Sequence, residues 1–263
     1  MRIATWNVNS IRARLPHLHD WLRRARPDVA CLQETKVEDD KFPTEALGDA
    51  GYRVVFSGQK SYNGVAIAAR FGLSIDDVKK NLVDDDDASP KRLIAATIEG
   101  IRVVNVYCPN GQAVGTKPFV FKLEWFGRLL RDLRAHENPQ NPLCLCGDFN
   151  VAPTTADVAE PKKWEGQVLC HPDERAALQR LFDWGLVDAQ RALFPDERAY
   201  SWWDYRAGAY PKNHGLRIDL ALVTQPLLSR VKDVWVDRSP RELERPSDHA
   251  PVIVDIDESQ GRG

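Results

Sequence analysis

Residues Leu143-Cys144-Leu145-Cys146-Gly147-Asp148-Phe149-Asn150 join an apolar run to a polar end, and this pattern is the starting point for predicting the fold. Residues 142–146 form a short apolar run, which is typical of a strand inside a sheet. Cys144 and Cys146 are two residues apart, so on a strand both side chains face the same side. We interpret them as core cysteines and keep a metal-binding pair as the less favoured alternative. The Gly-Asp-x-Asn end then places polar groups at the carboxyl end of this strand.

Similar short apolar runs surround this stretch and predict the rest of the sheet structure. The predicted strands are residues 2–8, 28–33, 52–56, 64–69, 93–98, 101–107, 142–146, 218–223, 231–236 and 251–256. Apolar residues at three- and four-residue steps predict helices over residues 11–24, 119–135 and 173–184. The strands come in hairpin-like pairs with few helices between them, so simple βαβ alternation does not fit. We predict an α/β fold in which two mixed β-sheets pack face to face with helices outside.

The composition is that of an ordinary folded chain. Of the 263 residues, 43% are hydrophobic and 28% are charged, which excludes a disordered or fibrous protein. The formal net charge of −2 excludes a histone-like coat of positive charge, but it permits a local basic face that binds nucleic acid. No linker is long enough to split the chain. We expect one catalytic domain over residues 1–257 and a polar tail over residues 258–263.

The sequence also indicates a cellular compartment. No apolar run approaches the roughly 18 residues of a membrane span, and the first residues lack the apolar core of a signal peptide. The five cysteines are an odd number, which without an export signal indicates reduced thiols and a cytoplasmic location. The acidic run over residues 84–87 is interpreted as a solvated loop.

Polar side chains gather where the predicted strands end or begin. They are Asn7, Asn9, Glu34, Tyr107, Asp148, Asn150, Asp219, Asp248 and His249. Taken singly, each has an ordinary structural explanation: Asp148 and Asn150 could form a turn, Asp219 could pair with Arg217 or with a backbone amide, and Asp248 could be a cap. Taken together they favour a shared site, because a buried charge is costly without a partner and strand ends converge on one rim.

The chemistry that needs this set of side chains is metal-assisted hydrolysis of a phosphodiester. Carboxylate and amide oxygens are the ligands that a hard divalent cation prefers, and such a cation neutralises the phosphate and the leaving oxygen. Asp219 could fix the tautomer of His249 and hold its charge. Asp148 could orient or deprotonate the attacking water. Asn150 and Tyr107 could stabilise the pentacovalent centre through hydrogen bonds.

Eight blocks of sequence, taken in order, resemble the exonuclease III family of abasic-site endonucleases, within the wider endonuclease, exonuclease and phosphatase superfamily. The blocks are residues 5–12 (TWNVNSIR), 31–36 (CLQETK), 63–67 (NGVAI), 105–111 (NVYCPNG), 147–150 (GDFN), 200–206 (YSWWDYR), 215–220 (GLRIDL) and 247–251 (SDHAP). Each block alone is weak, whereas all eight in the family's order are highly specific. They span nearly the whole chain.

The resemblance implies a four-layered α/β sandwich and a set of residue roles. It implies that Glu34 is the principal metal ligand, supported by Asn7, Asn9 and Asp248. It also implies that Asp148 aligns the attacking water with Asn150 as its partner, that Tyr107 contacts the phosphate, and that Asp219 and His249 form a dyad there. The metal of the family is usually Mg²⁺, and Mn²⁺ often substitutes. Whether one or two ions act is left open.

The resemblance also implies how DNA is held. Trp202, Leu216 and Ile218 match an apolar pocket for a flipped-out abasic sugar, and a sugar without its base costs little to extrude. Because neighbours on a strand point to opposite sides, one of Trp202 and Trp203 is expected in the core. The candidates for DNA contacts are Arg12, Lys36, Tyr62, Asn110, Gln112, Lys117 and Arg217. The alternative for the long side chains among them is ordinary solvated surface.

The expected function is therefore a DNA-repair hydrolase that cuts the phosphodiester 5′ to an abasic site and removes 3′-terminal nucleotides or 3′-blocking groups. The expected partner is double-stranded DNA carrying abasic sites or 3′ ends, with no membrane and with the protein as a monomer. One alternative is a phosphatase or phospholipase that acts on small phosphoesters. Another is a binding protein that has lost catalysis. Residues 153–172 are a variable segment, in which His171 is hypothesised to favour 3′ ends over internal sites.

Overall fold

Two six-stranded β-sheets face each other in the computed structural model, which describes residues 1–257. The strand order of the first sheet is β11 (Val231–Val236), β12 (Val252–Ile256), β1 (Arg2–Asn7), β2 (Val29–Gln33), β4 (Val65–Arg70) and β3 (Tyr52–Ser57). That of the second sheet is β5 (Asp76–Lys80), β6 (Leu93–Ile98), β7 (Ile101–Tyr107), β8 (Leu143–Asp148), β10 (Asp219–Thr224) and β9 (Leu186–Asp188). Both sheets are mixed, because β1 runs parallel to β2 and β7 parallel to β8, among antiparallel neighbours.

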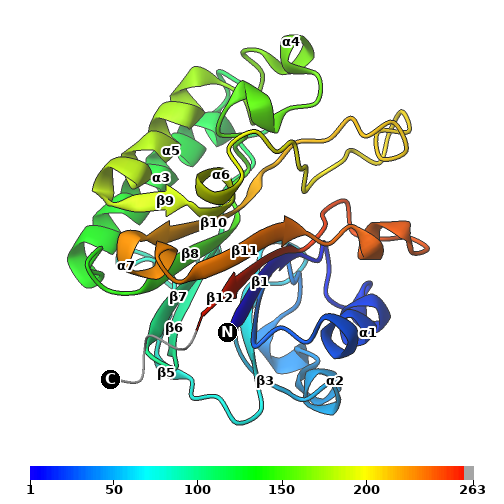
Figure 1. The fold of residues 1–263 in the computed structure, drawn as a ribbon, viewed down its shortest axis with the longest axis vertical. Helices are drawn as coiled ribbons and strands as arrows, with labels where there is room; N and C mark the ends of the chain where they lie inside the picture. Colours follow the sequence, from blue (N-terminus) through cyan, green and yellow to red (C-terminus); the bar gives the residue numbers. More distant parts are fainter. Residues whose placement is uncertain (258–263) are drawn as a thin grey trace.

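Helices cover the outer face of each sheet. In Figure 1, α1 (Leu15–Ala25) and α2 (Thr44–Asp49) lie beside the first sheet, and α3 (Lys117–His136) and α5 (Pro172–Trp184) lie beside the second. The short helices are α4 (Pro161–Trp164), α6 (Ala189–Leu193) and α7 (Gln225–Leu228). The apolar face of α3 packs on the second sheet through residues such as Phe126 and Leu129. This arrangement of helix, sheet, sheet and helix confirms the predicted α/β sandwich.

The strands read as continuous apolar runs because both faces of each sheet are buried. On β2, Val29 and Cys31 face the opposite sheet, whereas Ala30 and Leu32 face the helices. Cys144 and Cys146 of β8 also lie in the cluster between the sheets. All five cysteines are buried and unbridged, so the interpretation of Cys144 and Cys146 as core residues is confirmed.

The ten predicted strands are all present, and the structure adds two that the sequence did not indicate. The strand β5 is polar and largely exposed at a sheet edge, and β9 is only three residues long, so neither carries an apolar periodicity. The first helix was predicted to begin at residue 11, but it begins at Leu15. Residues 11–14 form a turn after Ser10, whose φ is 85°, and Pro16 then occupies the first helical turn, where proline is favoured.

The strand directions bring polar side chains to one edge of the sandwich. β1 and β2 end there in register, with Asn7 opposite Gln33, and Glu34 follows directly. In the second sheet, Tyr107 at the end of β7 and Asp219 at the start of β10 both lie opposite Asp148. The residues before β12 arrive at the same edge because β12 runs antiparallel to β1. We call this edge the polar rim, made up of Asn7, Glu34, Asp148, Asp219, Asp248 and His249.

Three remaining predictions concern the periphery of the molecule. The acidic run over residues 84–87 lies in a mostly exposed loop, as expected, with Asp84 and Asp85 paired to Arg128. Across residues 1–257, no helix combines the length and apolar character that a membrane span needs. The predicted tail over residues 258–263 lies outside the described residues.

Candidate active site

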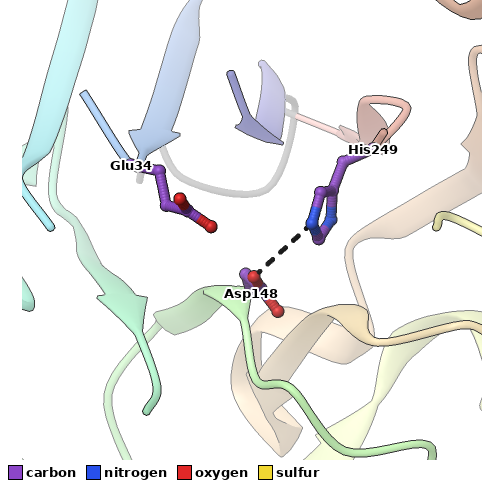
Figure 2. Close-up of side chains that lie close together, drawn as sticks. All are labelled: Glu34, Asp148 and His249. Carbon is purple, nitrogen blue, oxygen red and sulfur yellow. Dashed lines mark ion pairs between the residues drawn. The ribbon is translucent and has the colours of Figure 1, made fainter. Parts of the chain in front are cut away.

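Glu34, Asp148 and His249 form the centre of the polar rim. They come from segments more than a hundred residues apart, yet one ligand atom from each lies within 4.8 Å of those of the other two. Figure 2 shows the three side chains pointing toward one another, with His249 Nε2 3.7 Å from Asp148 Oδ2. Glu34 follows β2 of the first sheet, whereas Asp148 ends β8 of the second, so the cluster bridges the two sheets.

Asn7 joins these carboxylates across the two sheets. Its buried side-chain amide donates hydrogen bonds to Glu34 Oε1 at 2.8 Å and to Asp148 Oδ2 at 2.9 Å. The backbone carbonyl oxygen of Asn7 accepts a hydrogen bond from Ser247 Oγ at 2.7 Å. This hydrogen bond fixes the segment that carries Asp248 and His249. The structure therefore brings Asn7, Glu34 and Asp148 together, as the sequence led us to expect.

His249 and Asp219 form a buried pair. The imidazole Nδ1 lies 2.8 Å from Asp219 Oδ2, and both side chains are at most 5% exposed. Asp219 therefore pairs with His249, and the alternative of an Asp219–Arg217 pair is wrong. The other oxygen, Asp219 Oδ1, is buried and finds no hydrogen-bond partner among residues 1–257. A buried carboxylate oxygen without a donor is costly, so the rim holds more negative charge than its own residues compensate.

Burial and the crowding of charges shift the protonation of this pair and of Asp148. Burial, with the neighbouring Asp219 and Glu34 adding to it, raises the pKa of Asp148 to about 7, although His249 and Asn7 oppose the shift. Burial alone would lower the pKa of His249, but Asp219 and Asp148 outweigh it and raise that pKa to about 10. The imidazole is thus held as a cation between two carboxylates. An imidazolium held in this way can donate a hydrogen bond to a phosphate oxygen.

The turn after β8 places Asn150 beside Asp148. The Asn150 backbone amide donates to Asp148 Oδ1 at 2.9 Å, and its side-chain amide lies 3.2 Å from Asp148 Oδ2. Asn150 adopts a left-handed φ of 52°. Gly147 is required just before this turn, because a Cβ atom there would lie 1.9 Å from the carbonyl oxygen of Val106. Glycine at 147 therefore lets β8 approach β7 closely enough to position the Asp148 side chain.

Tyr107 lies at the end of β7, next to Asp148 in register. Burial raises the pKa of Tyr107, and the neighbouring carboxylates of Glu34 and Asp148 add to the shift. The guanidinium of Arg92 stands over the tyrosine ring, 4.7 Å from its centroid. Tyr107 is therefore a neutral hydroxyl at the edge of the carboxylate cluster, where it can donate a hydrogen bond.

Asn9 and Asp248 lie in a neighbouring layer of the rim. The Asn9 side chain donates to Asp248 Oδ1 at 2.9 Å, and the indole of Trp202 donates to Asp248 Oδ2 at 3.0 Å. Lys36 bridges this layer to the centre, with its Nζ 2.6 Å from Asn9 Oδ1 and 2.7 Å from Glu34 Oε2. Lys36, which was predicted as a DNA contact, therefore also contacts the Glu34 carboxylate directly.

The donor set of the rim fits a divalent cation. Four acidic side chains (Glu34, Asp148, Asp219 and Asp248) face one imidazole and one lysine ammonium, so negative charge exceeds positive even though the pKa of Asp148 is raised to about 7. The unpartnered Asp219 Oδ1 is a second sign of that excess. Oxygen ligands on rigid strand ends are the coordination that Mg²⁺ or Mn²⁺ prefers. A metal site at Glu34, with Asp148 and His249 beside it, is consistent with this geometry.

The three residues predicted to line the abasic pocket differ in their burial. Trp202 is half-buried, and Trp203 is fully buried, so the expectation that one of the two is a core residue is confirmed. Leu216 and Ile218 are at most 1% exposed and belong to one buried cluster with Val158, Leu169 and Cys170 of the variable segment and with Ala152. The apolar side of the pocket is thus covered by the variable segment. His171 in that segment caps α5, since its Nδ1 accepts a hydrogen bond from the Asp173 amide.

Most of the candidate DNA contacts lie on the surface near the rim. Lys36, Tyr62, Asn110 and Gln112 line a cavity of about 240 Å³ together with Glu34 and Tyr107. Tyr62 is 70% exposed there, which is unusual for a large aromatic side chain. Arg12 and Lys117 are also exposed, each at the start of a helix or just before one.

Arg217 does not belong with these contacts, and its prediction as a DNA contact is wrong. The side chain is 1% exposed, and its guanidinium donates to Asp157 Oδ1 at 2.7 Å and to Asp188 Oδ2 at 2.6 Å. Arg191 also donates to Asp157 Oδ1, at 2.6 Å. We call Asp157, Asp188, Arg191 and Arg217 the Arg217 network. The sequence placed Arg217 in a matching loop, but the two aspartates that bury it lie 60 and 29 residues away.

Three further residues support the rim and were assigned no role from the sequence. Ser201 Oγ accepts hydrogen bonds from the backbone amides of Ile218 and Asp219, at 3.1 and 3.0 Å. Lys122 and Glu174 form a fully buried pair behind Asn150. A signal for Lys122 was present, because it lies three residues after Phe119 and four before Phe126, on the apolar face of its helix.

Known proteins resemble this chain in both sequence and structure. Residues 4–249 match the family described as the Endonuclease/Exonuclease/phosphatase family. The chain is 36% identical to exodeoxyribonuclease III of Haemophilus influenzae, across 97% of this chain and 100% of that protein. Two solved structures superpose closely. The 3′ phosphatase NExo from Neisseria, solved with a product DNA hairpin, has a TM-score of 0.94 and 44% identity, covering 98% of this chain and 99% of its own. An AP endonuclease from Archaeoglobus fulgidus has a TM-score of 0.93 and 42% identity, with the same coverage.

These similarities confirm the predicted resemblance, the predicted fold and the predicted enzyme class, a hydrolase of the DNA-repair nuclease type. The alternative of a binding protein without catalysis is disfavoured as well, because the metal and dyad residues that such a protein should lack are present and meet at the rim. The chain belongs to the endonuclease/exonuclease/phosphatase family.

Proposed function

We propose that this protein is a Mg²⁺-dependent DNA phosphodiesterase that cuts 5′ to abasic sites and removes 3′-terminal nucleotides or blocking groups, leaving a 3′-hydroxyl. The observation that carries the proposal is the meeting of Glu34, Asp148 and His249 at one edge of the two sheets, with Asp219 behind the imidazole. The named activities of its relatives, exodeoxyribonuclease III and AP endonuclease, support it. Mn²⁺ is expected to substitute for Mg²⁺.

In this proposal the residues of the rim and their neighbours bind the metal ion or activate the attacking water. Glu34 and Asn7 would hold the metal ion, with Asn9 and Asp248 in support. A divalent ion bound there would neutralise the phosphate and the leaving oxygen. Asp148 orients the attacking water and accepts its proton, and Asn150 keeps both Asp148 oxygens in place.

The remaining side chains bind the reacting phosphate. The His249 imidazolium, held by Asp219, donates a hydrogen bond to a phosphate oxygen as negative charge develops there. Tyr107 donates a second one from its neutral hydroxyl. Lys36, Tyr62, Asn110 and Gln112 line the neighbouring cavity and contact the DNA backbone, while Arg12 and Lys117 contact phosphates farther out.

The burial of the predicted pocket favours 3′ ends among the possible substrates. Trp202, Leu216 and Ile218 were assigned to a pocket for an extruded sugar, yet Leu216 and Ile218 are buried in a cluster that includes Leu169 and Cys170. A 3′ end reaches the rim without extrusion into that pocket. The similarity to a 3′ phosphatase supports the same preference. His171, at the start of α5, remains a candidate for setting it.

The setting of the activity completes the proposal. We expect a monomer whose residues 1–257 act as one catalytic domain, working on double-stranded DNA in the cytoplasm. Five buried thiols are consistent with a reducing compartment.

A gel assay with end-labelled duplexes tests this function. One duplex carries an internal abasic site, a second a blocked 3′ end and a third neither, each with Mg²⁺ or with a chelator. We expect Mg²⁺-dependent products ending in a 3′-hydroxyl, formed faster from the 3′-blocked duplex than from the internal site. Inositol phosphates in parallel reactions test the phosphatase alternative. Cleavage that persists in the chelator, or release of phosphate from the inositol phosphates alone, would contradict the proposal.

A further inference from the structure

Lys122 is the one fully buried lysine of the described chain, and it lies directly behind the polar rim. It projects from the second turn of α3, on the same face as Phe119 and Phe126. Burial lowers the pKa of Lys122, and the carboxylate of Glu174 on α5 opposes that shift. A lysine is retained in such a place only if all of its donors are used, because an unpaired buried ammonium is very costly.

All three donors of the Lys122 ammonium have acceptors. Nζ donates to the Asn150 carbonyl at 2.6 Å, to the Asn110 carbonyl at 3.0 Å and to Glu174 Oε1. The side-chain stem is packed as well, since a Cβ atom on Gly111 would lie 3.0 Å from Lys122 Cδ. The ammonium therefore clamps the loop after β7 to the turn after β8.

The two loops that Lys122 joins carry residues that act on the substrate. Asn110 donates to Asn150 Oδ1 at 3.0 Å, and Asn150 donates to both oxygens of Asp148. Asn150 holds its left-handed φ of 52° while its carbonyl points at Lys122. An asparagine in that conformation has other conformations available, so the charge-assisted hydrogen bond from Lys122 selects the one that orients Asp148.

The other half of the pair reaches the segment that covers the apolar pocket. Glu174 accepts hydrogen bonds from the backbone amides of Leu169 and His171, at 3.2 and 3.0 Å. Leu169 belongs to the buried cluster that contains Leu216 and Ile218. The same buried ion pair thus touches the turn that orients the Asp148 carboxylate on one side and the pocket cover on the other.

We propose that Lys122 is a positioning residue for catalysis, which orients the Asp148 carboxylate by holding the Asn150 carbonyl. The inference rests on the proposed nuclease function, because it assigns Lys122 to the same reaction. Lys122 itself does not touch the substrate. Its loss should therefore slow the chemical step and leave DNA binding nearly unchanged.

The test compares single-turnover cleavage of the 3′-blocked duplex, and binding to it, for the wild type, Lys122→Met and the double variant Lys122→Met/Glu174→Gln. Methionine keeps the length of the stem without the donors, and the glutamine removes the carboxylate charge that Lys122→Met leaves unpaired. We expect a cleavage rate about 10- to 100-fold lower in both variants, with Kd changed less than about threefold. Lys79→Met is the matched control. Lys79 lies on β5 and pairs with Asp132, which is on α3 as Lys122 is, but toward the other end of that helix. It should cleave like the wild type.

The double variant separates positioning from stability. Most of the stability loss in Lys122→Met comes from the uncompensated Glu174, so the double variant should melt at a higher temperature while remaining slow. Recovery of the rate together with the melting temperature would overturn the inference, as would a rate equal to that of the wild type in either folded variant. If Lys122→Met does not fold, the double variant alone decides. A wild type that does not cleave DNA would instead refute the proposed function.

Discussion

The polar rim and the Arg217 network both bury carboxylates, but they compensate them differently. In the network, Arg217 binds Asp157 and Asp188, and Arg191 adds a second guanidinium to Asp157, so two acids meet two bases. In the rim, four carboxylates share one imidazole and one ammonium, and Asp219 Oδ1 has no donor within residues 1–257. The network is complete by itself and stabilises the fold. The rim is incomplete by itself, which is the state expected of a site that binds a cation.

The comparison predicts opposite effects of substitution in the two regions. Asp219→Asn removes one of the surplus charges of the rim and the acceptor that holds His249. We expect turnover on the 3′-blocked duplex to fall by about 10³- to 10⁴-fold, as when the carboxylate that orients a catalytic histidine is neutralised. The melting temperature should stay the same or rise, because the excess negative charge is reduced. Steady-state kinetics and a thermal melt measure the two quantities. A lower melting temperature together with unchanged turnover would contradict the prediction.

In the Arg217 network the reverse is expected. Arg217→Met leaves Asp157 and Asp188 buried with too little positive charge, which should cost about 3–5 kcal/mol of the free energy of unfolding. Denaturant titration measures that cost. The matched control is Arg206→Met, since Arg206 pairs with Asp204 on the surface and is 87% exposed there, where such pairs contribute little to stability. Equal losses in the two variants would show that the network is not the stabilising element.

The Arg217 network should also make stability depend on pH, with a smaller effect than the loss of Arg217. Burial alone would raise the pKa of Asp157, but the Arg217 guanidinium and its hydrogen bonds outweigh burial and lower that pKa. A carboxylate whose folded pKa is depressed stabilises the fold above its unfolded pKa of about 4, and that stability is lost as the pH falls through the folded value. The difference in free energy of unfolding between the wild type and Asp157→Asn should be full near pH 7 and shrink below about pH 4. Denaturant titrations at several pH values check this, and a constant difference would contradict it.

The sequence predicted the rim better than its surroundings, for a physical reason. Asp148 and His249 stand out because they are polar residues at the ends of apolar strands, and the strand ends of a sandwich must converge. The counter-charges of Arg217 and Lys122 come from distant segments, so their burial appears only in the folded chain. Arg217 was consequently assigned to the DNA surface.

The same distinction applies to the fold. Strands with apolar runs were predicted to within two residues, whereas the polar edge strand β5 was missed because pairing with β6, rather than its own side chains, makes it a strand. The burial of Leu216 and Ile218 in one cluster with Leu169 could not be predicted either, since it depends on the path of a variable segment.

The surplus carboxylates of the polar rim are expected to hold a divalent cation. This expectation is tested by Mn²⁺ binding, followed by electron paramagnetic resonance for the wild type and for Glu34→Gln. Glu34→Gln keeps the shape of the side chain and removes one charge from the centre of the rim. The account predicts that the wild type binds Mn²⁺ and that Glu34→Gln binds it at least about tenfold more weakly. Equal affinity in the two proteins, or no binding by the wild type, would contradict it.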